Sequence, residues 1–115
     1  MRIVTGVDIV DVARFEKVLE SSGKPFLERV FFETEYANSK TGHLAGIFAA
    51  KEAVKKAFDV VECEVWKKIE IRKRPSGKPE IVLYWDELEV KIMSSDVSIS
   101  HDGGTAAASF VAIIE

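Results

Sequence analysis

The first third of the chain changes from the pattern of a strand to that of a helix. Residues 3–10 form an apolar run rich in β-branched side chains, which predicts a buried strand. Over residues 11–22 apolar side chains recur at helical spacing, and Asp11 is placed to cap that helix at its N-terminus. Gly23 ends the pattern, and a further short helical segment is expected over residues 26–32.

The strongest helical pattern covers residues 41–58, and the remainder of the chain has the pattern of strands. Two hairpins are predicted, one from residues 65–74 and 80–85 and the other from residues 96–101 and 106–114. Residues 86–93 fit either a short helix or an irregular crossover. The order of strand, helices and strands predicts an α+β domain in which a mainly antiparallel sheet packs with the long central helix.

Composition and charge narrow the class of protein. The chain has 115 residues, of which 47% are hydrophobic and 30% charged, so a single domain over residues 1–115 is expected. The net charge of −3 argues against general attraction to nucleic acid. We expect no membrane association, because no apolar run approaches the ~20 residues that span a bilayer. We expect no signal peptide, because residues 1–6 lack its n-region and h-region. The single cysteine, Cys63, favours a cytoplasmic protein.

Two carboxylates in the sequence are candidates for a functional site. Asp8 stands inside the apolar run, where a carboxylate is costly unless it is solvated, hydrogen-bonded or bound to a metal. Its position alone favours hydrogen bonds to amides of the following helix. Glu52 and Lys56 lie one turn apart on the central helix, beside small alanines. An ordinary solvated ion pair, worth about 0.3–0.5 kcal/mol, would have the same spacing.

Together these residues are compatible with a magnesium site. Asp8 and Glu52 could hold Mg²⁺ with water and a substrate diphosphate, provided that the fold joins them. A nearby lysine would offset phosphate charge. His101 lies at a strand end before a Gly-Gly turn, and a lone histidine in that position is more often structural than catalytic. One cysteine and two histidines argue against zinc, and the Gly-rich Walker loop is missing.

Four segments, in order along the chain, resemble the bacterial holo-acyl-carrier-protein synthases. They are Thr5–Phe15, the central Phe-Ala-Ala-Lys-Glu-Ala motif Phe48–Ala53, the turn Ser76–Pro79, and Ser98–His101 before an alanine-rich last strand. The central motif is the most specific of the four, and the match covers nearly the whole chain. The resemblance implies the 4′-phosphopantetheinyl transferase fold, assembled as a homotrimer with coenzyme A at the subunit interfaces.

The resemblance also implies roles for individual residues. Asp8 and Glu52 would bind Mg²⁺ together with the diphosphate of coenzyme A, and Lys56 would contact the phosphates. His101 would lie near the diphosphate and nucleotide, and Arg14 would meet the acidic carrier protein. The turn near the adenine nucleotide would consist of Ser76, Gly77, Lys78 and Pro79.

The implied reaction is transfer of 4′-phosphopantetheine from coenzyme A to a serine of apo acyl carrier protein. Glu52, Lys56 and His101 would be catalytic, with either Glu52 acting through a bound water or His101 as the general base. Ile47 departs from the family, which often has arginine there, so this chain lacks the arginine to which one phosphate or carrier contact is usually attributed. The alternatives are another Mg²⁺-dependent phosphoryl or nucleotidyl enzyme and a catalytically silent, trimeric coenzyme A-binding scaffold.

Overall fold

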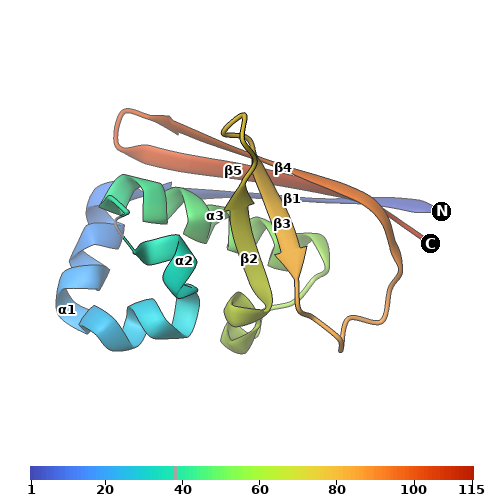
Figure 1. The fold of residues 1–115 in the computed structure, drawn as a ribbon, viewed down its shortest axis with the longest axis horizontal. Coiled ribbons are helices and arrows are strands. Elements are labelled where there is room, and N and C mark those ends of the chain that lie inside the picture. Colours follow the sequence, from blue (N-terminus) through green and yellow to red (C-terminus); the bar gives the residue numbers. More distant parts are fainter. Residues whose placement is uncertain (38) are drawn as a thin grey trace.

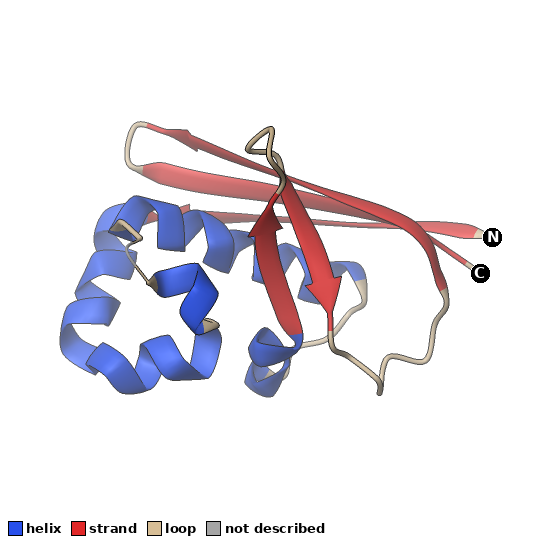
Figure 2. Cartoon of the chain, viewed as in Figure 1, coloured by secondary structure: helices blue, strands red, loops and turns tan. Residues whose placement is uncertain are grey.

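A three-stranded antiparallel sheet, with helices packed against one face, forms the frame of the molecule (Figures 1 and 2). The structure is a computed structural model and describes residues 1–37 and 39–115. The strands lie in the order β1-β5-β4, with bounds Arg2–Asp11 for β1, Ile92–Asp102 for β4 and Thr105–Ile114 for β5. The first and last strands are therefore neighbours, and the predicted α+β class with an antiparallel sheet is confirmed.

Helix α3, Thr41–Ala57, lies across one face of this sheet and forms the centre of the core. Its small side chains make a close approach possible, because Ala49 and Ala53 are completely buried against the strands. A Cβ atom at Gly6 of β1 would overlap the carbonyl oxygen of Ala53. Only glycine fits at that point of β1, and this contact sets the short distance between α3 and β1 next to Asp8.

Helix α1, Val12–Val30, is bent at Gly23, whose φ of 62° lies in the left-handed region. The Asp11 side chain accepts a hydrogen bond from the backbone N of Arg14 at 3.0 Å, which confirms the predicted N-cap. The helix and the short helical segment expected around this glycine are thus two halves of one bent element. The sequence is polar over residues 38–42 and predicts a break before the central helix; Asn38, within this stretch, lies outside the described residues.

A short helix, α2 (Glu33–Tyr36), precedes α3, and a two-stranded hairpin follows it. The hairpin consists of β2, Ile69–Lys73, and β3, Pro79–Leu83, which confirms its prediction. The strand expected from residue 65 starts four residues later, because Cys63–Lys68 forms the 3₁₀ helix η1. Residues 86–91 form turns and irregular backbone that lead into β4, so the irregular crossover is the correct alternative.

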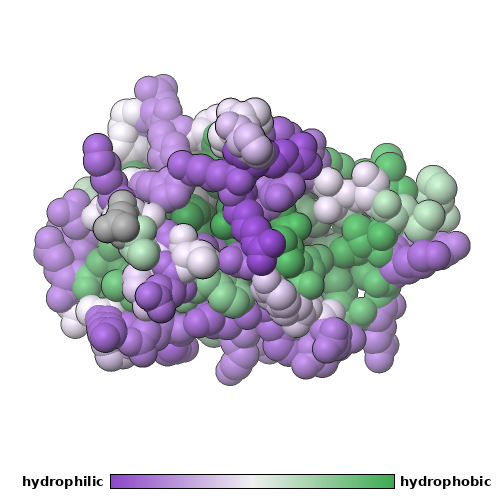
Figure 3. Space-filling view, viewed as in Figure 1, coloured by the Kyte–Doolittle hydropathy of each residue, from purple (hydrophilic) through white to green (hydrophobic). Residues whose placement is uncertain are grey.

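The second face of the three-stranded sheet is uncovered, which corrects the prediction that residues 3–10 form a buried strand. Val4 and Gly6 face α3, whereas Ile3, Val7 and Ile9 are 62–71% exposed. Apolar side chains occur on both sides of the strand, but the helices cover one side only (Figure 1). Apolar side chains also gather on the visible face near the chain termini (Figure 3). Among the described helices, none is long and apolar enough to cross a bilayer.

Candidate functional site

Asp8 and Glu52, which are far apart in the sequence, line one cleft of about 370 Å³. Asp8 projects from β1 toward the helical side of the sheet, and Glu52 projects from α3. Arg14, in the first turn of α1, lines the same cleft. The aromatic wall of the cleft includes Phe15 and Phe48, whose ring centroids are 5.5 Å apart. The fold thus brings together both predicted metal ligands and the predicted carrier-binding arginine.

Lys56 forms an ion pair with Asp8, with 2.9 Å between Nζ and Oδ1. The same ammonium donates a hydrogen bond to the carbonyl oxygen of Val7. The charge of Asp8 is therefore balanced by a lysine from α3. The hydrogen bonds to amides of the following helix, which the position of Asp8 in the sequence favoured, are not its partners here. The Lys56 side chain is 58% exposed while that of Asp8 is 16% exposed, so the lysine can leave the carboxylate without a large rearrangement.

Glu52 is held by two residues that the sequence analysis did not single out. The indole Nε1 of Trp66 donates a hydrogen bond to Oε2 of Glu52 at 2.7 Å. The ammonium of Lys55 lies 3.1 Å from the same oxygen. The spacing of Glu52 and Lys55 along the helix could have predicted their ion pair. The partnership with Trp66 depends on the packing of η1 against α1 and α3, and no pattern in the sequence signals it.

The donor set of this cleft suits a magnesium ion. Among residues 1–37 and 39–115, no group of three or more His, Cys, Asp or Glu side chains could enclose a metal ion by itself. Two carboxylates in one cleft nevertheless match Mg²⁺, which is usually held by one or two carboxylates together with waters and substrate phosphates. Each of the two carboxylates already attracts a lysine ammonium, so the cleft is a place where positive charge is stabilised.

His101 lines a different pocket, of about 180 Å³, together with Gly77 and Pro79 of the predicted nucleotide turn. Its Nε2 lies 2.9 Å from the carbonyl oxygen of Gly42 at the start of α3. The ring packs against Gly46, where a Cβ atom would lie 2.8 Å from Nε2. This pocket and the Asp8–Glu52 cleft share no residue and lie on different sides of α3. Within one chain, the structure does not join His101 to the carboxylates.

The rim of this second pocket is basic, and its wall is apolar. His43 lines the pocket together with Lys73. Burial lowers the pKa of His43, and the nearby charges of Lys73 and His101 lower it further. Ile47, the position at which the family often has arginine, is buried in the wall at 3% exposure.

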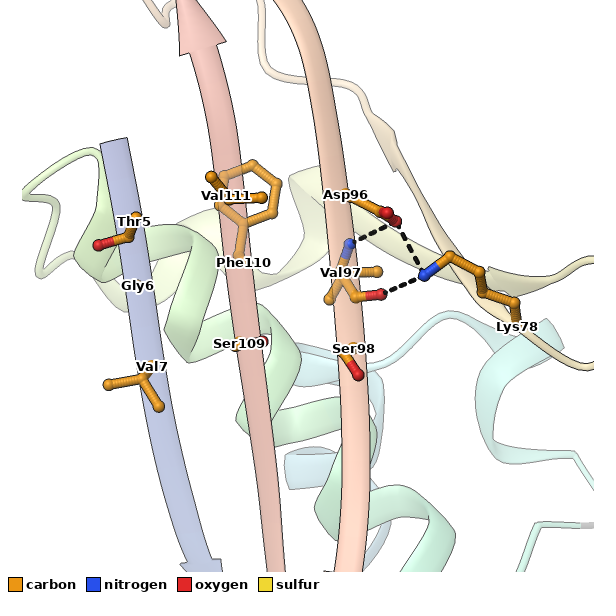
Figure 4. Close-up of a pocket in the computed structure, with 10 residues that line it drawn as sticks. All are labelled: Thr5, Gly6, Val7, Lys78, Asp96, Val97, Ser98, Ser109, Phe110 and Val111. Atoms are coloured by element: carbon orange, nitrogen blue, oxygen red, sulfur yellow. Dashed lines mark hydrogen bonds and ion pairs between the residues drawn. The ribbon is translucent and has the colours of Figure 1, made fainter. Parts of the chain in front are cut away.

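Lys78 and Ser76 of the predicted nucleotide turn do not line the His101 pocket. Lys78 instead spans to β4, where its Nζ lies 3.0 Å from Oδ1 of Asp96 and donates to the carbonyl oxygen of Val97 (Figure 4). This contact lowers the pKa of Asp96. Lys78 thereby borders a hollow of about 340 Å³ on the uncovered sheet face. Ser76 is exposed, and its hydroxyl accepts from the backbone N of Lys78 at 3.4 Å.

Lys51, the lysine of the central motif, is completely buried and has a structural role. Its ammonium lies 2.7 Å from Oε1 of Glu35 and donates to the carbonyl oxygens of Val30 and Trp66. Burial lowers the pKa of Lys51 to about 8, although the charge of Glu35 opposes this shift. Lys51 therefore ties the end of α1, α2 and η1 to α3, and Glu52 alone of the motif's two charged residues lines the cleft.

Comparison with known proteins agrees with this architecture. Residues 5–111 match the family model of the 4′-phosphopantetheinyl transferase superfamily. The holo-[acyl-carrier-protein] synthase of Chlorobaculum parvum is 40% identical over 110 residues, which cover 90% of this chain and 92% of the relative. That of a Geobacter species (strain M21) is 40% identical over 118 residues, with 93% and 94% covered.

A solved structure shows the same fold. The Helicobacter pylori holo-[acyl-carrier-protein] synthase in complex with coenzyme A superimposes with a TM-score of 0.84 at 37% identity. The superposition covers 95% of this chain and 99% of that one. The chain therefore belongs to the 4′-phosphopantetheinyl transferase superfamily and, within it, to the holo-[acyl-carrier-protein] synthases.

Proposed function

We propose that this protein transfers 4′-phosphopantetheine from coenzyme A to a serine of apo acyl carrier protein, with Mg²⁺ held by Asp8 and Glu52. The observation that carries the proposal is the cleft in which these two carboxylates meet, with Lys56 beside Asp8 and Arg14 at its edge. Family membership supports the transferase activity. The free, exposed thiol of Cys63 is compatible with a reducing compartment, and we propose that the protein is located in the cytoplasm.

In the proposed reaction, the serine oxygen forms a bond to the β-phosphorus of coenzyme A. The bond from that phosphorus to the oxygen bridging the two phosphates breaks, and adenosine 3′,5′-bisphosphate leaves. Bound Mg²⁺ supplies Lewis-acid polarisation and a template for the diphosphate. Lys56 is placed to exchange Asp8 for a phosphate oxygen and to offset the charge that develops there.

The serine proton needs an acceptor in the same cleft. Glu52 lines that cleft and is the general base that we favour, acting through water. His101 lies on another side of α3, so it could take part only from a neighbouring subunit. The same separation applies to Gly77 and Pro79, the turn residues that we propose for the nucleotide. A complete site therefore needs the carboxylate cleft of one chain beside the His101 pocket of another.

The direct test is the intact mass of an apo acyl carrier protein after incubation with the purified protein, coenzyme A and MgCl₂. We expect a mass gain of one phosphopantetheine group, and no gain in a parallel reaction with EDTA. A gain that persists in EDTA would contradict the metal requirement. No gain on any proven apo carrier would contradict the activity and leave the silent coenzyme A-binding scaffold.

We propose that the uncovered sheet face is the self-association surface of a homotrimer. Ile3, Val7, Ile9 and Val111 expose apolar surface there, around the hollow that Lys78 borders. Val7→Lys should turn the trimer into a monomer, because the lysine would have to bury an unpaired charge. Sedimentation velocity at micromolar concentration measures this change.

Val61→Lys is the matched control, because Val61 is 83% exposed and lies outside the sheet. It should sediment like the wild type. If the wild type is a monomer, or if the Val7→Lys variant remains a trimer, this sheet face is not the interface.

Arg14 is proposed to dock the acidic carrier protein from the edge of the cleft. Arg14→Glu should raise KM for the carrier by about tenfold or more while leaving coenzyme A affinity nearly unchanged, since opposite charges steer the encounter. Lys17→Glu makes the same charge change one turn further along α1 and, being outside the cleft lining, should have a smaller effect. Equal losses of carrier and coenzyme A affinity would refute the separate role of Arg14.

A further inference from the structure

We propose that Trp66 is a positioning residue for the metal site, which presents one chosen oxygen of Glu52 to the metal ion. The inference rests on the proposed function, because it takes Glu52 as a metal ligand. It assigns to Trp66 a role toward the metal in addition to its packing in the core.

The geometry separates the two oxygens of the Glu52 carboxylate. Both donors that reach this side chain, Nε1 of Trp66 at 2.7 Å and Nζ of Lys55 at 3.1 Å, bind Oε2. Oε1 receives no hydrogen bond from any residue that the structure describes. Since Glu52 lines the cleft with Asp8, Oε1 is the oxygen left for a ligand shared with Asp8.

The donors on Oε2 are held firmly. Trp66 is 9% exposed, and its ring centroid lies 5.6 Å from that of Phe48 and 6.4 Å from that of Phe26. The ammonium of Lys55 lies 4.9 Å from the centroid of the indole, and its side chain is 6% exposed. An indole N–H is a donor only, so it always favours an acceptor oxygen in this direction. The rotamer of Glu52 is thereby set by the core.

The two consecutive lysines of α3 consequently have different roles. Lys55 is buried between Glu52 and Trp66 and belongs to the support of the carboxylate. Lys56 is 58% exposed and holds Asp8 from the solvent side, from which it can move toward a phosphate. Residues that orient a metal ligand in this way typically change metal affinity 10–100-fold when they are removed.

Trp66→Phe tests the role directly, because it keeps an aromatic ring against Phe48 and Phe26 and removes the N–H donor. The probe is Mn²⁺, which prefers the same oxygen ligands as Mg²⁺. Binding is measured on the full chain from the electron paramagnetic resonance signal of free Mn²⁺, with coenzyme A at the same concentration in every sample and in the protein-free reference. We expect the Trp66→Phe variant to bind Mn²⁺ about tenfold more weakly than the wild type.

Trp85→Phe is the matched control, because the chain has two tryptophans and Trp85 packs against Phe58, away from Glu52. Its affinity for Mn²⁺ should equal that of the wild type. It also leaves Trp66 as the only indole, whose ¹⁵N–¹H signal should shift when Mg²⁺ is added. This signal tests the proposal even if the Trp66→Phe variant does not fold.

The outcomes distinguish this inference from the proposed function. If the wild type binds Mn²⁺ and the Glu52→Gln variant does not, the metal site stands. Unchanged affinity in the Trp66→Phe variant, or an indole signal that does not respond to Mg²⁺, then overturns the positioning role alone. If the wild type does not bind Mn²⁺, or if Glu52→Gln has no effect, the metal assignment fails and the positioning role fails with it.

Discussion

Glu52→Gln is expected to abolish phosphopantetheine transfer while the protein stays folded. Glutamine has nearly the same shape and retains a carbonyl oxygen that can accept the hydrogen bond from Trp66. It carries no negative charge, so the cleft loses one of the two carboxylates proposed to hold Mg²⁺ and the proposed general base. We expect the transfer rate to fall by at least roughly 10²–10³-fold, the loss typical when one group that stabilises developing charge is removed.

The rate is measured from the intact mass of the carrier protein over time at saturating coenzyme A. Glu16→Gln serves as the control, because it makes the same substitution on the exposed surface of α1 and should leave the rate unchanged. The thermal midpoints of both variants show whether the fold is intact. A rate close to that of the wild type in the Glu52→Gln variant would mean that Glu52 is neither metal ligand nor base.

Lys51→Met should have the largest effect on stability. Lys51 and Glu35 are both completely buried, and their atoms Nζ and Oε1 lie 2.7 Å apart. Removing the ammonium leaves the Glu35 carboxylate buried without its opposite charge, and two backbone carbonyl oxygens lose a donor. Breaking a buried ion pair in this way costs about 3–5 kcal/mol. Urea unfolding followed by circular dichroism measures the free energy of unfolding.

The double variant Lys51→Met with Glu35→Gln is the informative control. It removes the unpaired charge, although the backbone N–H groups of Phe32 and Ile71 lose part of the acceptor that Glu35 provides. We expect it to be more stable than the Lys51→Met variant and less stable than the wild type. A loss below ~1 kcal/mol in the Lys51→Met variant would show that this pair does not stabilise the junction of α1, α2 and α3.

The same lysine predicts a dependence of stability on pH. In the folded protein the pKa of Lys51 is about 8, whereas the ordinary value of a lysine is 10.5. Between these two values the unfolded chain binds more protons at this residue than the folded chain does. The free energy of unfolding of the wild type should therefore rise, relative to that of the Lys51→Met variant, from pH 8 to 10.5.

The local pattern of the sequence was sufficient for the main strands and helices and their order, but not for α2 or for the 3₁₀ helix η1. Strand and helix periods differ, and signals such as the Asp11 cap and the interruption at Gly23 act on their immediate neighbours, so both were predictable. That α1 continues beyond Gly23 as one bent element was not predicted. Four ordered motifs were sufficient for the family. Asp8 and Glu52 were predicted as a pair by the family resemblance, and spacing alone could not have joined them.

Only the tertiary structure decided how the charged residues divide between core and cleft. The sequence places Lys51, Lys55 and Lys56 on one helix, but each has a different partner in the fold. Lys51 is buried in an ion pair with Glu35, the ammonium of Lys55 lies over the ring of Trp66, and the exposed Lys56 pairs with Asp8. These partners come from segments distant in the chain, and local periodicity carries no information about which distant segments meet. For the same reason, the sequence showed that β1 is apolar on both sides, whereas only the fold shows that α3 covers one of them.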